Sequence, residues 1–168
     1  MTPALRTGGV LFFFTLPFGK LFSLSMTNPI PSLTTRVYWE DTDASGIVYH
    51  ANYIRWMERA RSEWARSLGL NQDALLTESH RALVVANLTI AYKRPAHLDD
   101  TVTVRTRLIA LKTASFVVEQ TVWRNQTLLT TANVRLGYVD TLTGHPVAFS
   151  PDTLTLFKSY LTSEDEQS

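Results

Sequence analysis

The segment EDTDASGIVYHANY (residues 40–53) holds the side chains whose types and spacing are best suited to chemistry. Asp41 and Asp43 flank a threonine, a turn of small residues follows, and His50 opens a stretch with helical spacing. A carboxylate at a strand end that faces the N-terminus of a buried helix lies beside unpaired backbone N–H groups. Such donors can polarise an acyl carbonyl while the carboxylate attacks it or activates a water.

The acidic turn has two other interpretations. Asp41, Asp43 and Ser45 match the first, third and fifth ligand positions of an EF-hand loop, but Asn52 stands where the bidentate glutamate is required. A strand also precedes the loop where an EF-hand has a helix, so we reject a calcium site. The simpler alternative, a polar turn that only caps the following helix, stays open on these residues alone.

Composition limits the classes of function. The chain has 168 residues, which indicates one domain, and its net charge of +1 lacks the basic excess of a nucleic-acid-binding protein. The chain has no cysteine, which excludes disulfides and a cysteine nucleophile and fits a reducing cytoplasm. A charged fraction of only 18% indicates that other subunits cover part of the surface. The histidines show no metal-ligand spacing, so we expect no metal and no cofactor: His50, His80, His97 and His145.

The two ends of the chain differ from the middle. Residues 10–22 are strongly apolar but too short and too broken by Pro17 and Gly19 to span a membrane. We expect residues 1–30 to be an extension outside the fold, with Met26 as the natural start and the preceding residues as upstream coding sequence. A targeting segment or a peripheral attachment to the inner membrane are the alternatives. The predicted domain covers residues 31–162, followed by a frayed tail at 163–168.

The middle of the chain predicts an α+β fold. β-Branched and aromatic residues indicate a strand at 34–40, and apolar residues at helical spacing indicate one long helix at 50–68, closed by Gly69. Four alternating runs lie between residues 82 and 139, and their short gaps favour hairpins and an antiparallel meander. Ser150, Pro151 and Asp152 then begin a short helix that runs to about residue 160.

Two segments carry a resemblance to a known family. VYWEDTDASGIVYHANYIRWMERARSEW (37–64) resembles the signature of hotdog-fold acyl-CoA thioesterases, and AYKRPAHLDDTVTVRT (91–106) is similar to the second-strand region of that family. The similarity is closest to the Tol-Pal-associated YbgC type and more distant to 4-hydroxybenzoyl-CoA thioesterase. It implies a five-stranded antiparallel sheet wrapped around one long central helix. It also implies a homodimer or tetramer with active sites between protomers.

The resemblance also implies roles for individual residues. Asp43 matches the active carboxylate, as nucleophile or general base, and His50 matches a histidine with a supporting catalytic role. Asp41 is expected to shape the turn by bonding local amides. The remaining candidates are the backbone donors Val48 and Tyr49, the aromatic substrate walls Tyr53 and Trp56, and the phosphate-binding cations Lys93 and Arg94.

The central helix also carries glutamates, and another branch of hotdog thioesterases has its carboxylate there. Glu58 and Glu63 have Arg59 and Arg61 beside them, so structural ion pairs are the expected role of these acids. Arg59 is expected to pair with Glu63.

These predictions combine into a cytoplasmic acyl-CoA thioesterase that releases a free acid and coenzyme A, with acyl carrier protein as a possible replacement for coenzyme A. One alternative is a hotdog hydratase or dehydratase, which an enoyl-thioester hydration assay would reveal. The other is a non-catalytic acyl-thioester-binding or scaffold subunit, which would bind acyl-CoA tightly without turnover.

Overall fold

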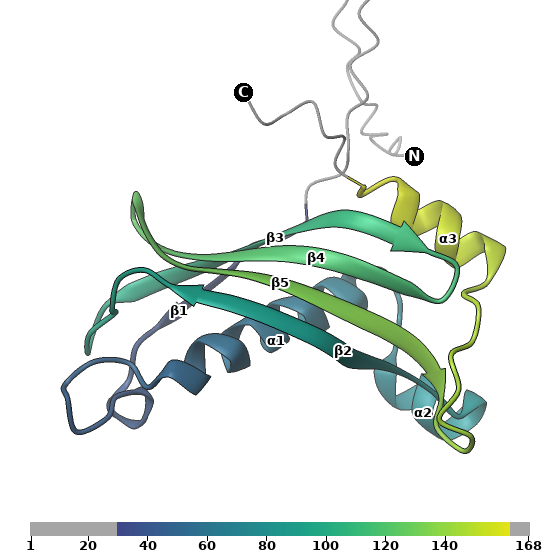
Figure 1. The fold of residues 1–168 in the computed structure, drawn as a ribbon, viewed down its shortest axis with the longest axis horizontal. Helices are drawn as coiled ribbons and strands as arrows, with labels where there is room; N and C mark the ends of the chain where they lie inside the picture. Colours follow the sequence, from purple (N-terminus) through teal and green to yellow (C-terminus); the bar gives the residue numbers. More distant parts are fainter. Residues whose placement is uncertain (1–29, 162–168) are drawn as a thin grey trace, which may run out of the picture.

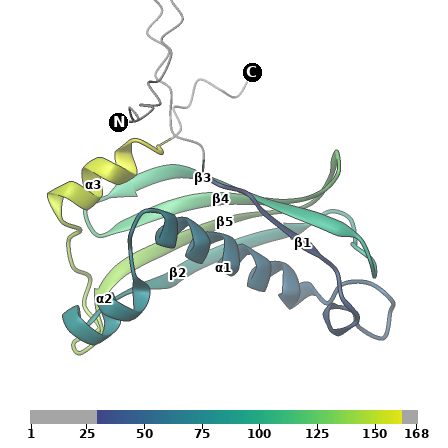
Figure 2. The ribbon, with the colours of Figure 1, turned by 180° about the vertical axis from the view of Figure 1, so that it is seen from behind.

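A single curved sheet holds a long helix against its concave face (Figures 1 and 2). The computed structural model describes residues 30–161. Its strands are β1 (Leu33–Arg36), β2 (Arg81–Tyr92), β3 (Thr101–Lys112), β4 (Ser115–Arg124) and β5 (Thr127–Asp140). Its α-helices are α1 (His50–Ser67), α2 (Gln72–Ser79) and α3 (Pro151–Lys158). The predicted five-stranded antiparallel sheet around one long helix, with a short C-terminal helix, is therefore confirmed.

The strand order is β1-β3-β4-β5-β2, and every neighbouring pair is antiparallel. Strands β3, β4 and β5 form the predicted hairpin meander, but the prediction is wrong for β2. That strand pairs with β5 and not with β3, because residues 93–100 cross the N-terminal end of α1 to reach the other side of the sheet. Strand β2 is consequently an edge strand.

The core lies between α1 and the inner face of the sheet. Trp56, Met57 and Trp64 of the helix are at most 2% exposed, and they meet strand residues such as Val104 and Leu108 at 0%. Each such side chain contributes about 1.5–3 kcal/mol by leaving water. The helix ends one residue earlier than predicted, and Gly69 follows it at φ +77°, the left-handed conformation that glycine adopts without strain.

The boundaries of the first elements differ from the prediction. Strand β1 ends at Arg36 and not at residue 40, because the Asp41 carboxylate accepts the Tyr38 N–H (2.8 Å) and turns Trp39–Asp41 into a 3₁₀ helix, η1. Helix α2 was not predicted. Its start is capped by Asn71, whose side chain accepts two backbone N–H groups of the first turn.

The ends of the described region join the core. Ile30, which was assigned to the N-terminal extension, packs against it, and Leu161 forms a β-bridge with Leu108. The predictions for residues 1–29 and for the tail lie outside the described residues. Within residues 30–161 no helix combines the length and the apolar character needed to cross a membrane.

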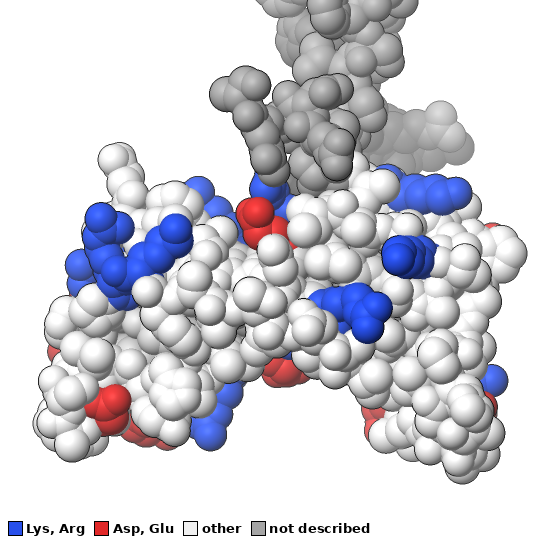
Figure 3. Space-filling model, viewed as in Figure 1, with Lys and Arg blue, Asp and Glu red and all other residues white. Residues whose placement is uncertain are grey.

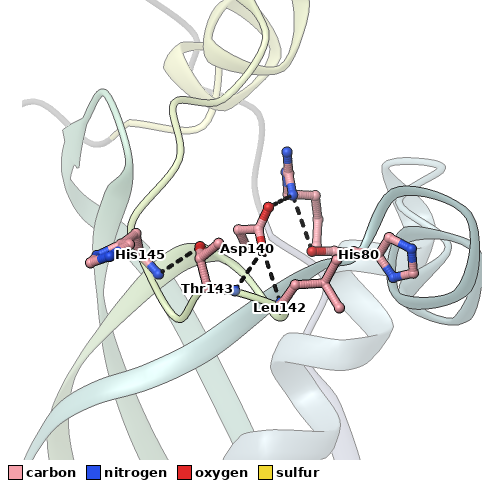
Figure 4. A network of polar contacts seen from close by, with 6 residues as sticks. His80, Asp140, Leu142, Thr143 and His145 are labelled. Carbon is pink, nitrogen blue, oxygen red and sulfur yellow. Dashed lines mark hydrogen bonds and ion pairs between the residues drawn. The ribbon is translucent and has the colours of Figure 1, made fainter.

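A carboxylate closes the end of the β5–β2 pair (Figure 4). Asp140 accepts the N–H groups of Thr143 (3.0 Å) and Leu142 (2.9 Å) and pairs with Arg81, and these contacts hold the pKa of Asp140 below its usual value. His80, at φ 52°, is the C-cap residue of α2 just before β2, and its imidazole and that of His145 point away from the carboxylate. The network thus stabilises a turn and leaves both rings free of it.

Candidate active site

The acidic turn forms a small hairpin-like loop before α1. Asp43 donates its N–H to the Ile47 carbonyl (3.0 Å) and accepts the Gly46 N–H at its own carbonyl (2.9 Å). Gly46 lies at φ +77°, so this turn favours glycine at that position. An isolated β-bridge between Thr42 and Val48 closes the loop. The backbone of Asp43 is therefore fixed from both sides.

Ser45 donates two hydrogen bonds to the Asp43 side chain. Its hydroxyl and its backbone N–H (2.8 Å) both donate to the same carboxylate oxygen of Asp43. These two bonds hold the pKa of Asp43 below its ordinary value, with a smaller contribution from the nearby His50. The carboxylate is exposed in the single chain. It is thus an accessible, charged oxygen at neutral pH.

Asp41 has a structural position in the same loop. Its carboxylate holds the start of η1, and its carbonyl accepts the Tyr49 N–H (2.9 Å) and the buried Asn52 side-chain amide (2.8 Å). Asp41 therefore joins the turn to the first residues of α1, the turn-shaping role expected from its sequence position. The hydrogen bond of Asn52 was not predicted, because this residue stands out in the sequence only as the one in place of the EF-hand glutamate.

The backbone donors at the helix start are not the predicted ones. The Val48 N–H donates to the Ala96 carbonyl (2.9 Å) and the Tyr49 N–H to Asp41, so the prediction that these two groups are free donors is wrong. The β-bridge of the loop reaches Val48, and Tyr49 bonds back to Asp41 directly after it, which is why both amides are already paired. The first two helical N–H groups, those of His50 and Ala51, have no acceptor among residues 30–161. They are the available donors.

His50 lies on the exposed side of the helix start. Its ring centroid is 4.4 Å from that of Tyr49 and 6.3 Å from that of Tyr92, and its carbonyl accepts the Tyr92 hydroxyl (3.0 Å). No hydrogen bond joins the imidazole to Asp43 in the described part of the chain. Tyr92 was not predicted, because 42 residues separate it from His50 and only the packing of α1 against the sheet brings them together.

The two predicted aromatic walls, Tyr53 and Trp56, are 2% exposed and belong to the packed core. The Tyr53 hydroxyl accepts the Ala96 N–H (2.9 Å), and burial raises the pKa of this phenol. Together with the Val48 bond, this contact ties the loop after β2 to the N-terminal end of α1.

Lys93 and Arg94 follow Tyr92 directly and are exposed at the same end of the molecule as the acidic turn. Figure 3 shows basic side chains spread over the outer face of the sheet, with more Lys and Arg than acids. Some of these cations have other partners: Arg107 pairs with Glu119 (3.0 Å), and Arg105 lies over the Trp123 ring.

The helix acids have separate partners. Glu63 pairs with Arg66 and not with Arg59, and Glu58 accepts the Ser62 hydroxyl (2.6 Å) instead of forming an ion pair within the described residues. Arg61 turns inward and bonds the buried Gln120 side chain. Within residues 30–161 no three His, Asp or Glu side chains gather in a way that could hold a metal ion.

A curved antiparallel sheet around a buried helix, with an ionised aspartate beside open amides at the start of that helix, is the arrangement expected of a hotdog-fold thioesterase. A sequence model of the "Thioesterase-like superfamily" matches residues 37–157, and the chain belongs to this family.

Known proteins agree with this assignment. The acyl-CoA thioesterase YbgC of Haemophilus influenzae is 43% identical over 126 residues, covering 75% of this chain and 93% of that protein. The acyl-CoA thioester hydrolase YbgC of Escherichia coli is 40% identical over 124 residues, covering 73% and 92%. A solved "probable thioesterase" of Bartonella henselae is 36% identical with a TM-score of 0.67, covering 71% of this chain and 98% of that one. The predicted family resemblance is confirmed.

Proposed function

We propose that this chain hydrolyses acyl-CoA thioesters to a free carboxylic acid and coenzyme A, with Asp43 as the reacting carboxylate. The proposal rests on two observations: Asp43 is an accessible, ionised carboxylate in the loop that leads into α1 and is influenced by the charge of His50, and the His50 and Ala51 N–H groups have no acceptor among residues 30–161. The acyl-CoA class of substrate is supported by the names of the YbgC relatives.

The chemistry follows from these groups. The thioester carbonyl oxygen accepts the N–H groups of His50 and Ala51 at the positive end of the α1 dipole, where developing negative charge is stabilised. Asp43 then either attacks the carbonyl carbon, forming an anhydride that water cleaves, or removes a proton from an attacking water. On either route one water is consumed and the thiolate of coenzyme A leaves. His50 orients water or supplies a proton to that thiolate.

A second copy of the chain completes the site in this proposal. Strand β2 is an edge strand of 12 residues, and its Val84 and Val85 are 40% and 51% exposed. A long edge with exposed apolar side chains is suited to antiparallel pairing with a partner strand. Exposed aromatic rings surround the acidic turn: Tyr38, Trp39, Tyr49 and Tyr92. Covering them would exclude water from Asp43. Dimer and tetramer both satisfy this requirement.

The polar part of the substrate has a candidate position. Lys93 and Arg94 are the exposed cations closest in sequence to Tyr92, which bonds His50. We assign them to the phosphates of coenzyme A, or to the phosphate of a carrier protein's pantetheine arm. The proposed compartment is the cytoplasm, where acyl-CoA is present, and peripheral contact with the inner membrane is compatible with it.

The test is release of free thiol from short, long and aromatic acyl-CoAs by the purified full chain. Asp43→Asn should lower kcat by about 10³-fold or more, the scale of losing a central catalytic group, with the fold retained. Asp73→Asn, an exposed acid on α2, is the matched control and should keep full activity. Equal activity of Asp43→Asn and the unmodified chain would remove Asp43 from the mechanism. Hydration of an enoyl thioester without thiol release would indicate a hydratase instead.

A further inference from the structure

A second polar feature lies in the C-terminal half of α1, away from the acidic turn. Arg61 is 9% exposed, and its guanidinium makes one hydrogen bond, to the Gln120 side-chain carbonyl (2.7 Å). No carboxylate lies within 4.0 Å of it among residues 30–161, and no other acceptor there receives its remaining N–H groups. Burial lowers the pKa of Arg61, and the charge of the exposed Glu58 offsets this only in part.

Arg61 borders a cavity between α1, the sheet and α3. The cavity has an interior of about 90 Å³ and opens to solvent at its mouth. Its wall is apolar and comes from β2, β4, β5, α3 and the segment after α1: Leu70, Leu83, Val85, Phe116, Leu136 and Phe157. Trp64 lines it as well, and no acceptor within the described range 30–161 receives the buried Trp64 Nε1–H.

The rim of the cavity is polar and already satisfied. Gln72 donates to the Ser62 hydroxyl (3.1 Å), which donates to Glu58 (2.6 Å). Glu58 is exposed, so solvent screens its charge, whereas Arg61 is surrounded by protein. The buried part of the cavity therefore combines an apolar wall with the positive charge of Arg61. The N–H groups of Arg61 and Trp64 that make no hydrogen bond within residues 30–161 are available there as donors.

We propose that this cavity binds a carboxylic acid with an apolar tail, whose carboxylate pairs with Arg61 and accepts the indole N–H of Trp64. A carboxylate suits the guanidinium because charge-assisted bonds to it are among the strongest in proteins, and the apolar wall suits the tail. Arg61 is eleven residues after His50, which is about 16 Å along the helix axis, so the site is separate from the acidic turn of the same chain. If the natural ligand is the acid released from the thioester, that identity rests on the proposed function. The binding of a carboxylic acid in this cavity does not depend on it.

The experiment compares sodium octanoate with octanol, which has the same tail and no charge, by calorimetric titration of the full chain. Octanoate should bind about tenfold more tightly or better, and Arg61→Met should remove that difference while octanol affinity stays within about twofold. Arg59→Met, an exposed arginine on the same helix, is the matched control and should leave octanoate binding unchanged. Equal affinity for acid and alcohol, or an unaltered octanoate affinity in Arg61→Met, overturns the proposal.

A second readout needs no change at Arg61. The chain has four tryptophans, so its indole N–H groups give four NMR signals, and Trp64→Phe identifies the one from Trp64. Octanoate should shift this signal and octanol should shift it much less; an unmoved Trp64 signal at saturating octanoate overturns the proposal. The titration is repeated in Asp43→Asn, where binding should persist within about twofold. Binding lost in that variant would assign the acid to the catalytic turn, whereas binding without any thioesterase activity would contradict only the proposed function.

Discussion

Gln120 accepts a hydrogen bond from the buried Arg61 and so offsets part of the free-energy cost of burying that charge. Replacing Gln120 tests this role directly. The side chain is fully buried on β4 and makes three hydrogen bonds. It accepts from Arg61 (2.7 Å) and donates to the Met57 carbonyl (3.0 Å) and the Thr106 hydroxyl (2.9 Å). One amide therefore joins α1 to two strands. Gln120→Leu keeps the approximate volume and removes all three bonds.

The expected loss of stability follows from the groups left behind. A lost hydrogen bond to a charged group costs about 1.5–3 kcal/mol, and an unsatisfied buried hydroxyl costs about 1–3 kcal/mol. Arg61 and Thr106 are both at least nine-tenths buried, so water restores little of this. Gln120→Leu should lower the free energy of unfolding by about 3–5 kcal/mol. Adding Arg61→Met should recover about 2 kcal/mol of this, because the unpaired charge is then absent.

Urea unfolding followed by circular dichroism, at one fixed protein concentration, measures both effects. Gln126→Leu, an exposed glutamine in the β4–β5 turn, is the control and should stay within about 0.5 kcal/mol of the unmodified chain. A loss below about 1 kcal/mol for Gln120→Leu, or strict additivity of the two changes, would refute the view that Gln120 compensates the buried charge.

Two further predictions concern pH. Ser45→Ala removes the largest cause of the lowered Asp43 pKa, so this pKa should rise and the acid limb of the kcat/KM profile should move to higher pH; Ser79→Ala, an exposed serine on α2, should leave the limb in place. An unshifted limb would mean that Asp43 does not control it. For Asp100, burial raises the pKa but bonds from the His97 N–H (2.8 Å) and Arg124 (2.7 Å) outweigh it, so the net pKa is lowered. The stability that Asp100 contributes is present above its unfolded-state pKa and disappears as pH falls through the lowered folded-state value. Asp100→Asn should therefore cost about 1–3 kcal/mol at neutral pH, and urea unfolding should show the difference vanishing in acid; a constant difference would contradict this.

Periodicity predicted the elements well where packing is regular. The four alternating runs predicted between residues 82 and 139 correspond to β2, β3, β4 and β5, and the alternation is clearest in β3 and β4, where every second residue is buried. The position of β2 beside β5 was not predictable from hairpin lengths, since it depends on a crossing connection over α1. Helix α2 was missed because its weak amphipathic pattern gives little signal, although Asn71 before Gln72 and Asp73 is a recognisable cap.

The sequence predicted which segment forms the candidate site, but it predicted few of the contacts that hold the site together. Asp43, Ser45 and His50 are close in sequence, so the loop that joins them could be read locally. The bonds of Tyr92 to His50 and of Ala96 to Val48 join residues more than 40 positions apart, and nothing local encodes them. For the same reason the inward turn of Arg61 to Gln120 was missed, and surface ion pairing was expected instead.

The start of α1 differs from the start of the other two α-helices in a way that favours a functional explanation. Asn71 and Ser150 cap α2 and α3 with side-chain oxygens, whereas Tyr49 at the cap position of α1 supplies no such bond. A serine, threonine, asparagine or aspartate in its place would stabilise a helix by about 1 kcal/mol, but its oxygen would occupy an amide of the first turn. An uncapped start keeps the His50 and Ala51 N–H groups open to an incoming carbonyl oxygen. The missing cap is therefore a feature of α1 that packing alone does not require and that the proposed thioester hydrolysis does.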